Sequence, residues 1–153
     1  MNRRATIELT AEERQAYVPS APTIHLCTNG KDGYPHVVPM WFAADGDRTV
    51  WMTTYRKSQK VLNIRRNPKV TLLVESGVTY DTLKGVMIRG HAEIIDDSDA
   101  VVQVLKRVHA KSTGSFPEGI DEALRAQAVK RVVIKVNAVR VSSWDHRKLG
   151  GTY

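Results

Sequence analysis

Short runs of alternating apolar and polar residues, separated by turn-forming residues, occupy most of the first two-thirds of the chain. An alternation with a period of two is typical of strands that bury one face. The pattern predicts six strands, at residues 21–28, 36–44, 48–54, 69–75, 85–96 and 130–144. Asn-Gly and Asp-Gly pairs within residues 29–33, and Asp-Gly-Asp at 45–47, predict tight turns between the first three strands.

Other segments show the 3.6-residue spacing of an apolar helix face, and they predict helices at residues 8–18, 98–111 and 120–128. The second of these has four apolar residues at one-face spacing: Val101, Val104, Leu105 and Val108. In the first, Thr10 and Glu13 have the spacing of a capping box, which marks a helix start.

A strongly basic segment, KSQKVLNIRRNP, lies between the third and fourth predicted strands and spans Lys57 to Pro68. Ser58 is the predicted N-cap of a short helix there, and Asn67-Pro68 ends it because the residue before proline avoids the helical region. Its predicted apolar side consists of Val61, Leu62 and Ile64. The basic residues in and beside it are Arg56, Lys57, Lys60, Arg65, Arg66 and Lys69.

Together these elements predict a mainly β, α+β protein: a six-stranded antiparallel barrel with flanking helices. Pro39 indicates an edge strand or a bulge rather than a regular central strand, because proline has no N–H to donate to a ladder. Gly90 inside the fifth strand indicates a bend. The 153 residues, without repeats or a linker, are expected to form one domain over residues 1–153.

Composition narrows the class of protein. With 42% hydrophobic and 25% charged residues the chain is expected to be globular rather than disordered. No apolar run reaches the roughly 18 residues of a membrane span, and the N-terminus is too charged for a secretory signal. Cys27 is the sole cysteine, which excludes an intrachain disulfide and a cysteine-based zinc site within one chain. We expect a cytoplasmic protein without a membrane partner.

The net charge of +7 suits nucleic acid, an anionic membrane surface or a phosphorylated small molecule. A nucleic-acid-binding barrel is the main alternative from another class, but signatures of RNA-recognition or helix-turn-helix modules are absent and the charge gathers at one helix start. We therefore expect no nucleic-acid partner.

The start of the basic helix has the features of a phosphate site. A helix N-terminus presents free N–H groups and a partial positive charge, to which Lys57, Ser58 and Lys60 would add two ammonium groups and a hydroxyl. Thr53 and Thr54 end the preceding strand beside it. The alternative interpretation is a solvated helix face without a ligand.

A flat ring fits the second predicted strand, PHVVPMWF, with its polar edge at the backbone near Pro39 and its phosphate at the basic helix. Trp41 and Trp51 are equally compatible with plain core packing. No catalytic side chain and no metal site is predicted. The five histidines, His25, His36, His91, His109 and His146, lack metal-ligand spacing, and a structural or hydrogen-bonded role is expected for His25 and His36.

Three stretches, DGYPHVVPMWF, VWMTTYRKSQKVLNIRRNPKVTLLVE and GVMIRGHAEIIDD, in this order and spacing resemble the pyridoxamine-phosphate-oxidase-like split β-barrel flavoproteins. The resemblance covers roughly residues 23–97, with support from RVVIKVNAVRVSSW. Its specific part is the family pattern Thr-Asn-x-x-Ser-x-Lys followed by Asn-Pro, which here reads TTYRKSQK and then Asn67-Pro68.

The resemblance implies a homodimer with two cofactor sites at the subunit interface and hydride transfer to or from a small-molecule substrate. The implied cofactor-binding residues are Val38, Pro39, Met40, Trp41, Thr53, Thr54, Lys57, Ser58 and Lys60. Tyr80 and Trp144 are further candidates, contributed by the partner subunit.

True pyridoxamine-phosphate oxidases carry Arg-x-Val-Leu-Leu-Lys where this chain has HVVPMWF, and an arginine-rich motif that SSWDHRKLGGTY lacks. Vitamin B6 oxidation is therefore not expected. The chain is similar to the branch that uses the deazaflavin F420, whose polyglutamate tail would meet Arg56, Arg65 and Arg66. The expected function is an F420-dependent oxidoreductase. The alternatives are an FMN-dependent oxidoreductase and a non-catalytic carrier of flavin or haem.

Overall fold

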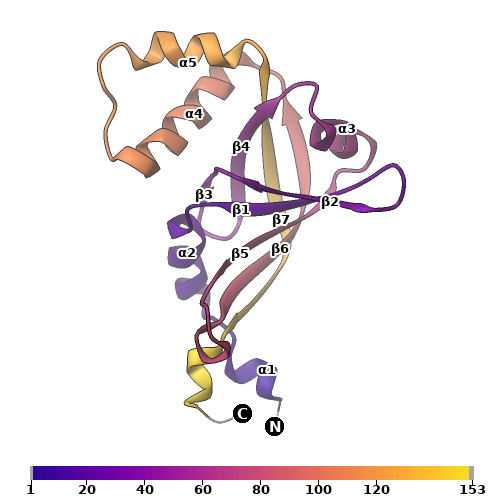
Figure 1. Cartoon of the computed structure of the whole chain (residues 1–153), viewed down its shortest axis with the longest axis vertical. Coiled ribbons are helices and arrows are strands. Elements are labelled where there is room, and N and C mark those ends of the chain that lie inside the picture. Colours follow the sequence, from indigo (N-terminus) through magenta and orange to yellow (C-terminus); the bar gives the residue numbers. More distant parts are fainter. Residues whose placement is uncertain (1, 152–153) are drawn as a thin grey trace.

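The computed structural model describes residues 2–151. Its centre is one curled antiparallel sheet of strand order β2-β1-β5-β6-β7-β4-β3 (Figure 1). The strands are β1 (Ile24–Asn29), β2 (Pro35–Met40), β3 (Ala43–Asp45), β4 (Thr49–Tyr55), β5 (Lys69–Ser76), β6 (Lys84–Ile95) and β7 (Arg131–Asp145). The predicted class, a mainly β antiparallel split barrel with flanking helices, is confirmed.

The sheet curls because β2 and β3 are consecutive in the chain yet form its two opposite edges. Only Trp41 and Phe42 separate them, and three Cα–Cα steps span at most about 11 Å. The two edges therefore approach each other at this crossover without pairing. The sequence predicted one strand over residues 36–44, and its division here makes seven strands in place of six.

The division follows from the pairing of the strands. β2 pairs with β1 at one edge of the sheet, whereas β3 pairs with β4 at the other. At the crossover the Phe42 side chain is fully buried and Trp41 is 75% exposed. Pro39 lies in edge strand β2, as predicted.

The helices cover the ends and one side of the sheet (Figure 1). They are α1 (Arg3–Thr6), α2 (Ala11–Ser20), α3 (Gln59–Arg66), α4 (Ser98–Thr113) and α5 (Ile120–Ala128), with single 3₁₀ turns η1 (Tyr80–Thr82) and η2 (His146–Leu149). The predicted capping box of α2 is present: the Glu13 N–H donates to Thr10 Oγ1 at 3.1 Å and the Thr10 N–H to Glu13 Oε2 at 2.7 Å. Turn η2 follows β7 directly.

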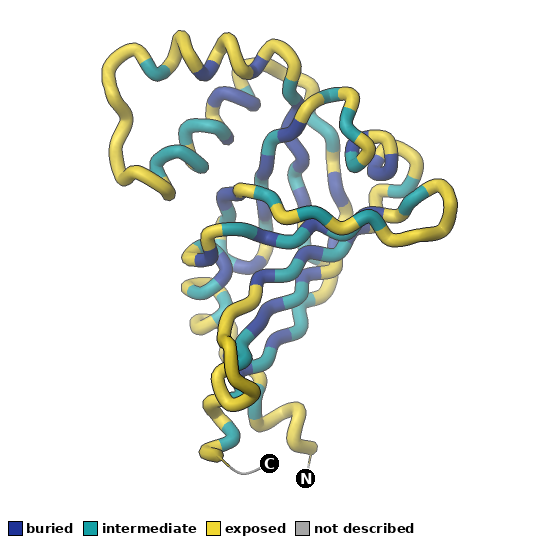
Figure 2. Tube along the Cα trace, viewed as in Figure 1, coloured by how far each residue is buried: buried dark blue, intermediate teal, exposed yellow. Residues whose placement is uncertain are grey.

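Two apolar clusters form the core (Figure 2). The larger fills the inside of the curled sheet, and the smaller joins α4 and α5 to β7 through Val101, Leu124 and Val133 among others. The predicted face of α4 is confirmed, since Val101 and Val104 are buried and the other two residues pack against the same cluster. No helix in residues 2–151 is long and apolar enough to cross a membrane.

Gly90 marks a register shift between β6 and β7, the bend that the sequence predicted. A Cβ built on Gly90 would lie 2.5 Å from the Asn137 carbonyl oxygen. We expect Gly90→Ala to lower the free energy of unfolding by about 1–3 kcal/mol, because backbone atoms must move to admit the methyl group. Urea denaturation measures this change, and an unaltered midpoint would contradict the packing at this site.

Candidate functional site

The end of β4 and the start of α3 bring three of the predicted polar residues together. The Lys60 ammonium donates to Thr54 Oγ1 at 3.1 Å, and the Thr54 hydroxyl donates to Ser58 Oγ at 3.3 Å. Ser58 is the N-cap residue of α3, as predicted, but its side chain does not cap the helix. The first turn of the helix thus has no side-chain acceptor of its own.

Lys60 carries a charge that no carboxylate neutralises. Its burial lowers the pKa of the ammonium, because removal from water disfavours the charged form. Among the described residues it forms no ion pair. An anion bound beside Lys60 would restore the favourable environment of the ammonium, and this arrangement fits a phosphate group.

The far half of α3 is tied to the hairpin formed by β1 and β2. The buried Asn63 side chain donates from Nδ2 to Thr28 Oγ1 at 3.0 Å, and it accepts from Gln59 Nε2 at 2.9 Å. Arg66 donates from Nη2 to the carbonyl oxygen of Asn29. These bonds fix the basic helix between the end of β4 and the hairpin that carries the predicted ring-binding segment.

Asn63 is the positioning residue that the sequence analysis missed. The predicted apolar side of α3 included Leu62, but Leu62 is 52% exposed while Asn63 is fully buried. That part of the prediction was wrong, because the helix turns toward a hydroxyl on β1 rather than toward apolar side chains alone. A polar residue between the buried Val61 and Ile64 was the available signal.

The predicted ring-binding residues of β2 divide between two faces. Val38 and Met40 pack against the main core, whereas Pro39 and Trp41 are exposed. The alternation follows from the strand geometry. A ring on the outer face would therefore meet Pro39 and Trp41 directly and would reach Val38 and Met40 through their backbone groups.

The two threonines at the end of β4 also differ in placement. Thr54 is buried and joins the Lys60 cluster, while Thr53 is half-buried and opposite Val133 in the ladder with β7. Successive strand residues point to opposite faces. Thr54 is thus the threonine that the structure brings to the basic helix.

The basic residues around the Lys60 cluster differ in whether they have an ion-pair or hydrogen-bond partner. Arg56 forms a two-bond ion pair with Asp96, at 2.9 Å from Nε and 2.8 Å from Nη2, and also donates to the Val129 carbonyl. The Asp96 carboxylate raises the pKa of Arg56. Lys57 and Arg65 are exposed, and neither forms a hydrogen bond or ion pair shown for the described part of the chain.

Tyr80 and Trp144 lie near the chain termini, at the end of the sheet away from α3 (Figure 1). His146 Nδ1 lies 2.7 Å from the Tyr80 carbonyl oxygen, and the two rings are 4.6 Å apart between centroids. Trp144 is opposite Gly85 in the ladder of β6 and β7, and a Cβ on Gly85 would meet its indole at 2.3 Å. Within one chain these residues do not join the Lys60 cluster.

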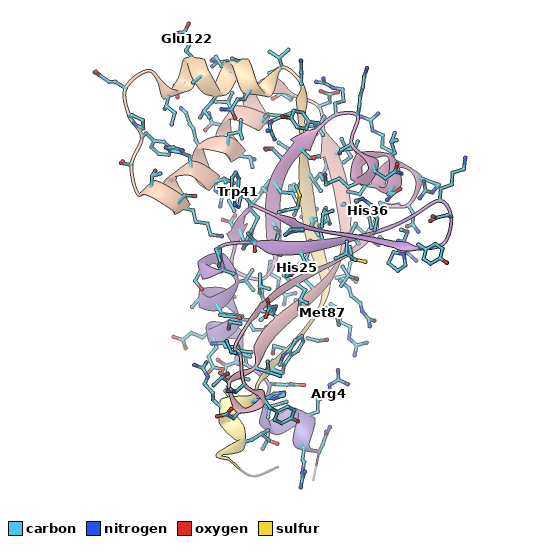
Figure 3. The ribbon with its side chains drawn as sticks, viewed as in Figure 1. Arg4, His25, His36, Trp41, Met87 and Glu122 are labelled. Atoms are coloured by element: carbon cyan, nitrogen blue, oxygen red, sulfur yellow. The ribbon has the colours of Figure 1, made fainter. Side chains whose placement is uncertain are left out.

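No group of three or more His, Cys, Asp or Glu able to hold a metal ion occurs within residues 2–151. The Nδ1 atoms of His25 and His36 are buried without a hydrogen-bond partner among the described residues. These two residues lie on the adjacent strands β1 and β2 (Figure 3).

A family model described as Pyridoxamine 5'-phosphate oxidase matches residues 10–145. The chain belongs to this family. Within the family's fold, its structure is similar to that of the conserved hypothetical protein Rv2991 from Mycobacterium tuberculosis, with 40% sequence identity and a TM-score of 0.90 over 100% of this chain and 95% of that one.

A solved structure of an F420 reductase is also similar to this chain, at 31% identity and a TM-score of 0.64, covering 82% of this chain and 93% of that one. A putative 5-nitroimidazole antibiotic resistance protein from Bacteroides thetaiotaomicron shares the fold at 21% identity and a TM-score of 0.73, over 90% of this chain and 85% of that one. A comparison with curated proteins finds no match.

Proposed function

We propose that this chain is an F420-dependent oxidoreductase that transfers a hydride between the deazaflavin and an unsaturated small molecule. The observation that carries the proposal is the Thr54–Ser58–Lys60 cluster, in which a desolvated ammonium without a carboxylate stands at a helix start. A flavin-type cofactor bound here supplies the hydride chemistry, and the protein supplies orientation and electrostatics.

The residues divide into two roles. The phosphate of the cofactor is held by Lys57, Ser58 and Lys60, with Thr54 orienting the ammonium of Lys60 and Thr53 near the polar edge of the ring. The ring lies along β2, where Val38 and Met40 offer backbone groups and Pro39 and Trp41 offer side chains. No side chain is assigned a catalytic role, and solvent is sufficient as the proton source.

F420 is favoured over FMN by similarity to the F420 reductase, at 31% identity over 82% of this chain. The charge argument for a polyglutamate tail is weaker than the sequence indicated, since Arg56 is paired with Asp96 and Arg66 is bound to the hairpin. Lys57 and Arg65 are the basic residues left to bind the polyglutamate tail of F420. FMN is accordingly the alternative cofactor, which the family membership supports equally well.

The location of Tyr80 and Trp144 supports a homodimer. They lie at the end of the sheet away from α3, so they would close the site of a partner subunit rather than that of their own chain. This proposal makes each cofactor site composite.

Mixing two variants tests the composite site. With Lys60→Ala and Trp144→Ala subunits refolded together in equal amounts, half of the dimers are mixed and each mixed dimer has one intact site. We expect about a quarter of the wild-type binding capacity at a cofactor concentration that leaves both parent variants empty. No recovery on mixing would place all the binding residues in one chain.

The proposed activity is tested with chemically reduced F420 and a set of conjugated ketones, nitro compounds and unsaturated acids. Protein-dependent, multiple-turnover reappearance of oxidised F420 fluorescence is expected with at least one of them. Tight F420 binding without turnover on any compound would favour the non-catalytic carrier.

A further inference from the structure

A cavity of about 280 Å³ lies where the crossover between β2 and β3 passes helix α4. Figure 3 shows Trp41 at the base of that helix. The lining residues come from the end of α2, the crossover and α4: Ser20, Pro22, Trp41, Phe42, Val108, Lys111 and Ser112. Its volume is just below that of pockets for drug-sized ligands, which suits a molecule with a single ring.

The Lys111 ammonium is the charged group of this cavity. Its Nζ atom lies 3.4 Å from the centroid of the Phe42 ring and donates to the Phe42 carbonyl oxygen at 3.3 Å. It forms no ion pair among the described residues. Burial lowers the pKa of the Lys111 ammonium to about 8.

The neighbouring charged groups do not neutralise the positive charge of Lys111. Arg107, one turn earlier on α4, lies 2.8 Å from the Asp45 carboxylate of β3, so that carboxylate is already paired. His109 stacks on Phe116, with 6.3 Å between the ring centroids. The charge of Lys111 is therefore available to an anion that enters the cavity.

The two hydroxyl groups of the lining are already used in hydrogen bonds within the chain and do not donate to this anion. Ser20 Oγ donates to the Tyr17 carbonyl at 2.7 Å, and Ser112 Oγ donates to the Val108 carbonyl at 3.1 Å. An ammonium has three N–H donors and one of them is used by Phe42, so Lys111 retains donors for a ligand.

The lining of the cavity also includes a flat apolar surface. The Trp41 indole is 75% exposed, which is unusual for the largest side chain of a soluble protein and leaves a ring face open for stacking. A cation beside an exposed aromatic ring matches a ligand that is planar at one end and anionic at the other.

We propose that this cavity binds a planar conjugated carboxylate, with the carboxylate on Lys111 and the ring stacked against Trp41. Because Trp41 also ends the segment assigned to the cofactor ring, the ligand would be the substrate of the reaction, and this role rests on the proposed function. The binding itself does not require a cofactor.

The test uses trans-cinnamate and its neutral amide, cinnamamide, titrated calorimetrically into the cofactor-free full chain. The two molecules have nearly the same shape and differ in charge, so we expect cinnamate to bind at least tenfold more tightly. Equal affinities for the two compounds, or no binding of either, would overturn the proposal.

The pH dependence gives a signature that a merely structural lysine would not produce. Anion binding favours the protonated ammonium, so affinity is full below the pKa of about 8 and is lost above it. Cinnamate affinity should fall about tenfold between pH 7 and pH 9, while its own carboxylate stays ionised throughout. A flat profile over this range would assign the binding to another group.

Variants of Lys111 complete the design. Lys111→Met should lose at least tenfold in cinnamate affinity, and Lys111→Arg should retain binding but lose the pH dependence, because arginine stays charged. Lys106→Met is the matched control on the same helix, where the ammonium pairs with Asp121 at 2.7 Å, and it should bind as the wild type does. Loss in Lys106→Met equal to that in Lys111→Met would overturn the assignment.

A parallel titration of the wild type with F420 separates the two proposals. Cofactor binding without discrimination between cinnamate and cinnamamide would overturn this inference alone. Selective cinnamate binding without cofactor binding would support the anion site and contradict the proposed function.

Discussion

Replacing Lys60 with alanine is expected to weaken binding of the phosphate-bearing cofactor by roughly 10- to 150-fold, equivalent to about 1.5–3 kcal/mol. The loss is large because the ammonium is partly desolvated and has no carboxylate of its own, so the ligand phosphate supplies its counter-charge. Fluorescence titration of cofactor-free protein with F420 measures the change.

Arg66→Ala is the matched control, since Arg66 belongs to the same helix but is exposed and bound to the Asn29 carbonyl. An exposed charge contributes less than about 1 kcal/mol, so its removal should alter the cofactor affinity by no more than a few-fold. Equal losses in both variants would show that the phosphate does not lie at the start of α3.

Phe42→Ala is expected to lower the free energy of unfolding by about 3–5 kcal/mol, the largest stability change that we predict. Phe42 is fully buried where the two edges of the sheet meet, so the truncation opens a cavity at the closure of the barrel. It also removes the ring over which the Lys111 ammonium lies. Denaturant unfolding monitored by circular dichroism measures the loss.

Trp41→Ala provides the control for Phe42→Ala, because the adjacent side chain is mostly exposed. A surface substitution of this kind should change stability by less than about 0.5 kcal/mol. If Trp41→Ala destabilised the isolated chain as strongly as Phe42→Ala, the outward position of Trp41 would be wrong.

Much of the fold could be predicted from the sequence because local signals agreed with one another. Period-two alternation identified the strands, the Thr10–Glu13 spacing identified the start of α2, and Gly90 identified the bend in β6. The split at Trp41-Phe42 could not be predicted. An exposed residue followed by a buried one is also the normal alternation within a single strand, so the sequence has no local signal for the split.

The candidate site was predictable in part for the same reason. The spacing of Ser58 and Lys60 placed them on the first turn of a helix, and the structure brings both to Thr54. The role of Asn63 depends on a hydroxyl from β1, which is distant in sequence. The role proposed for Trp144 depends on the proposed partner subunit. Pairings of that kind arise from tertiary and quaternary packing.

The most direct test of the central claim is a fluorescence titration of the purified, cofactor-free protein with F420 and, separately, with FMN at moderate salt. We predict tight F420 binding and weak FMN binding. Tighter binding of FMN would make the chain an FMN protein, and binding of neither would contradict the cofactor site and leave the basic helix as a solvated surface.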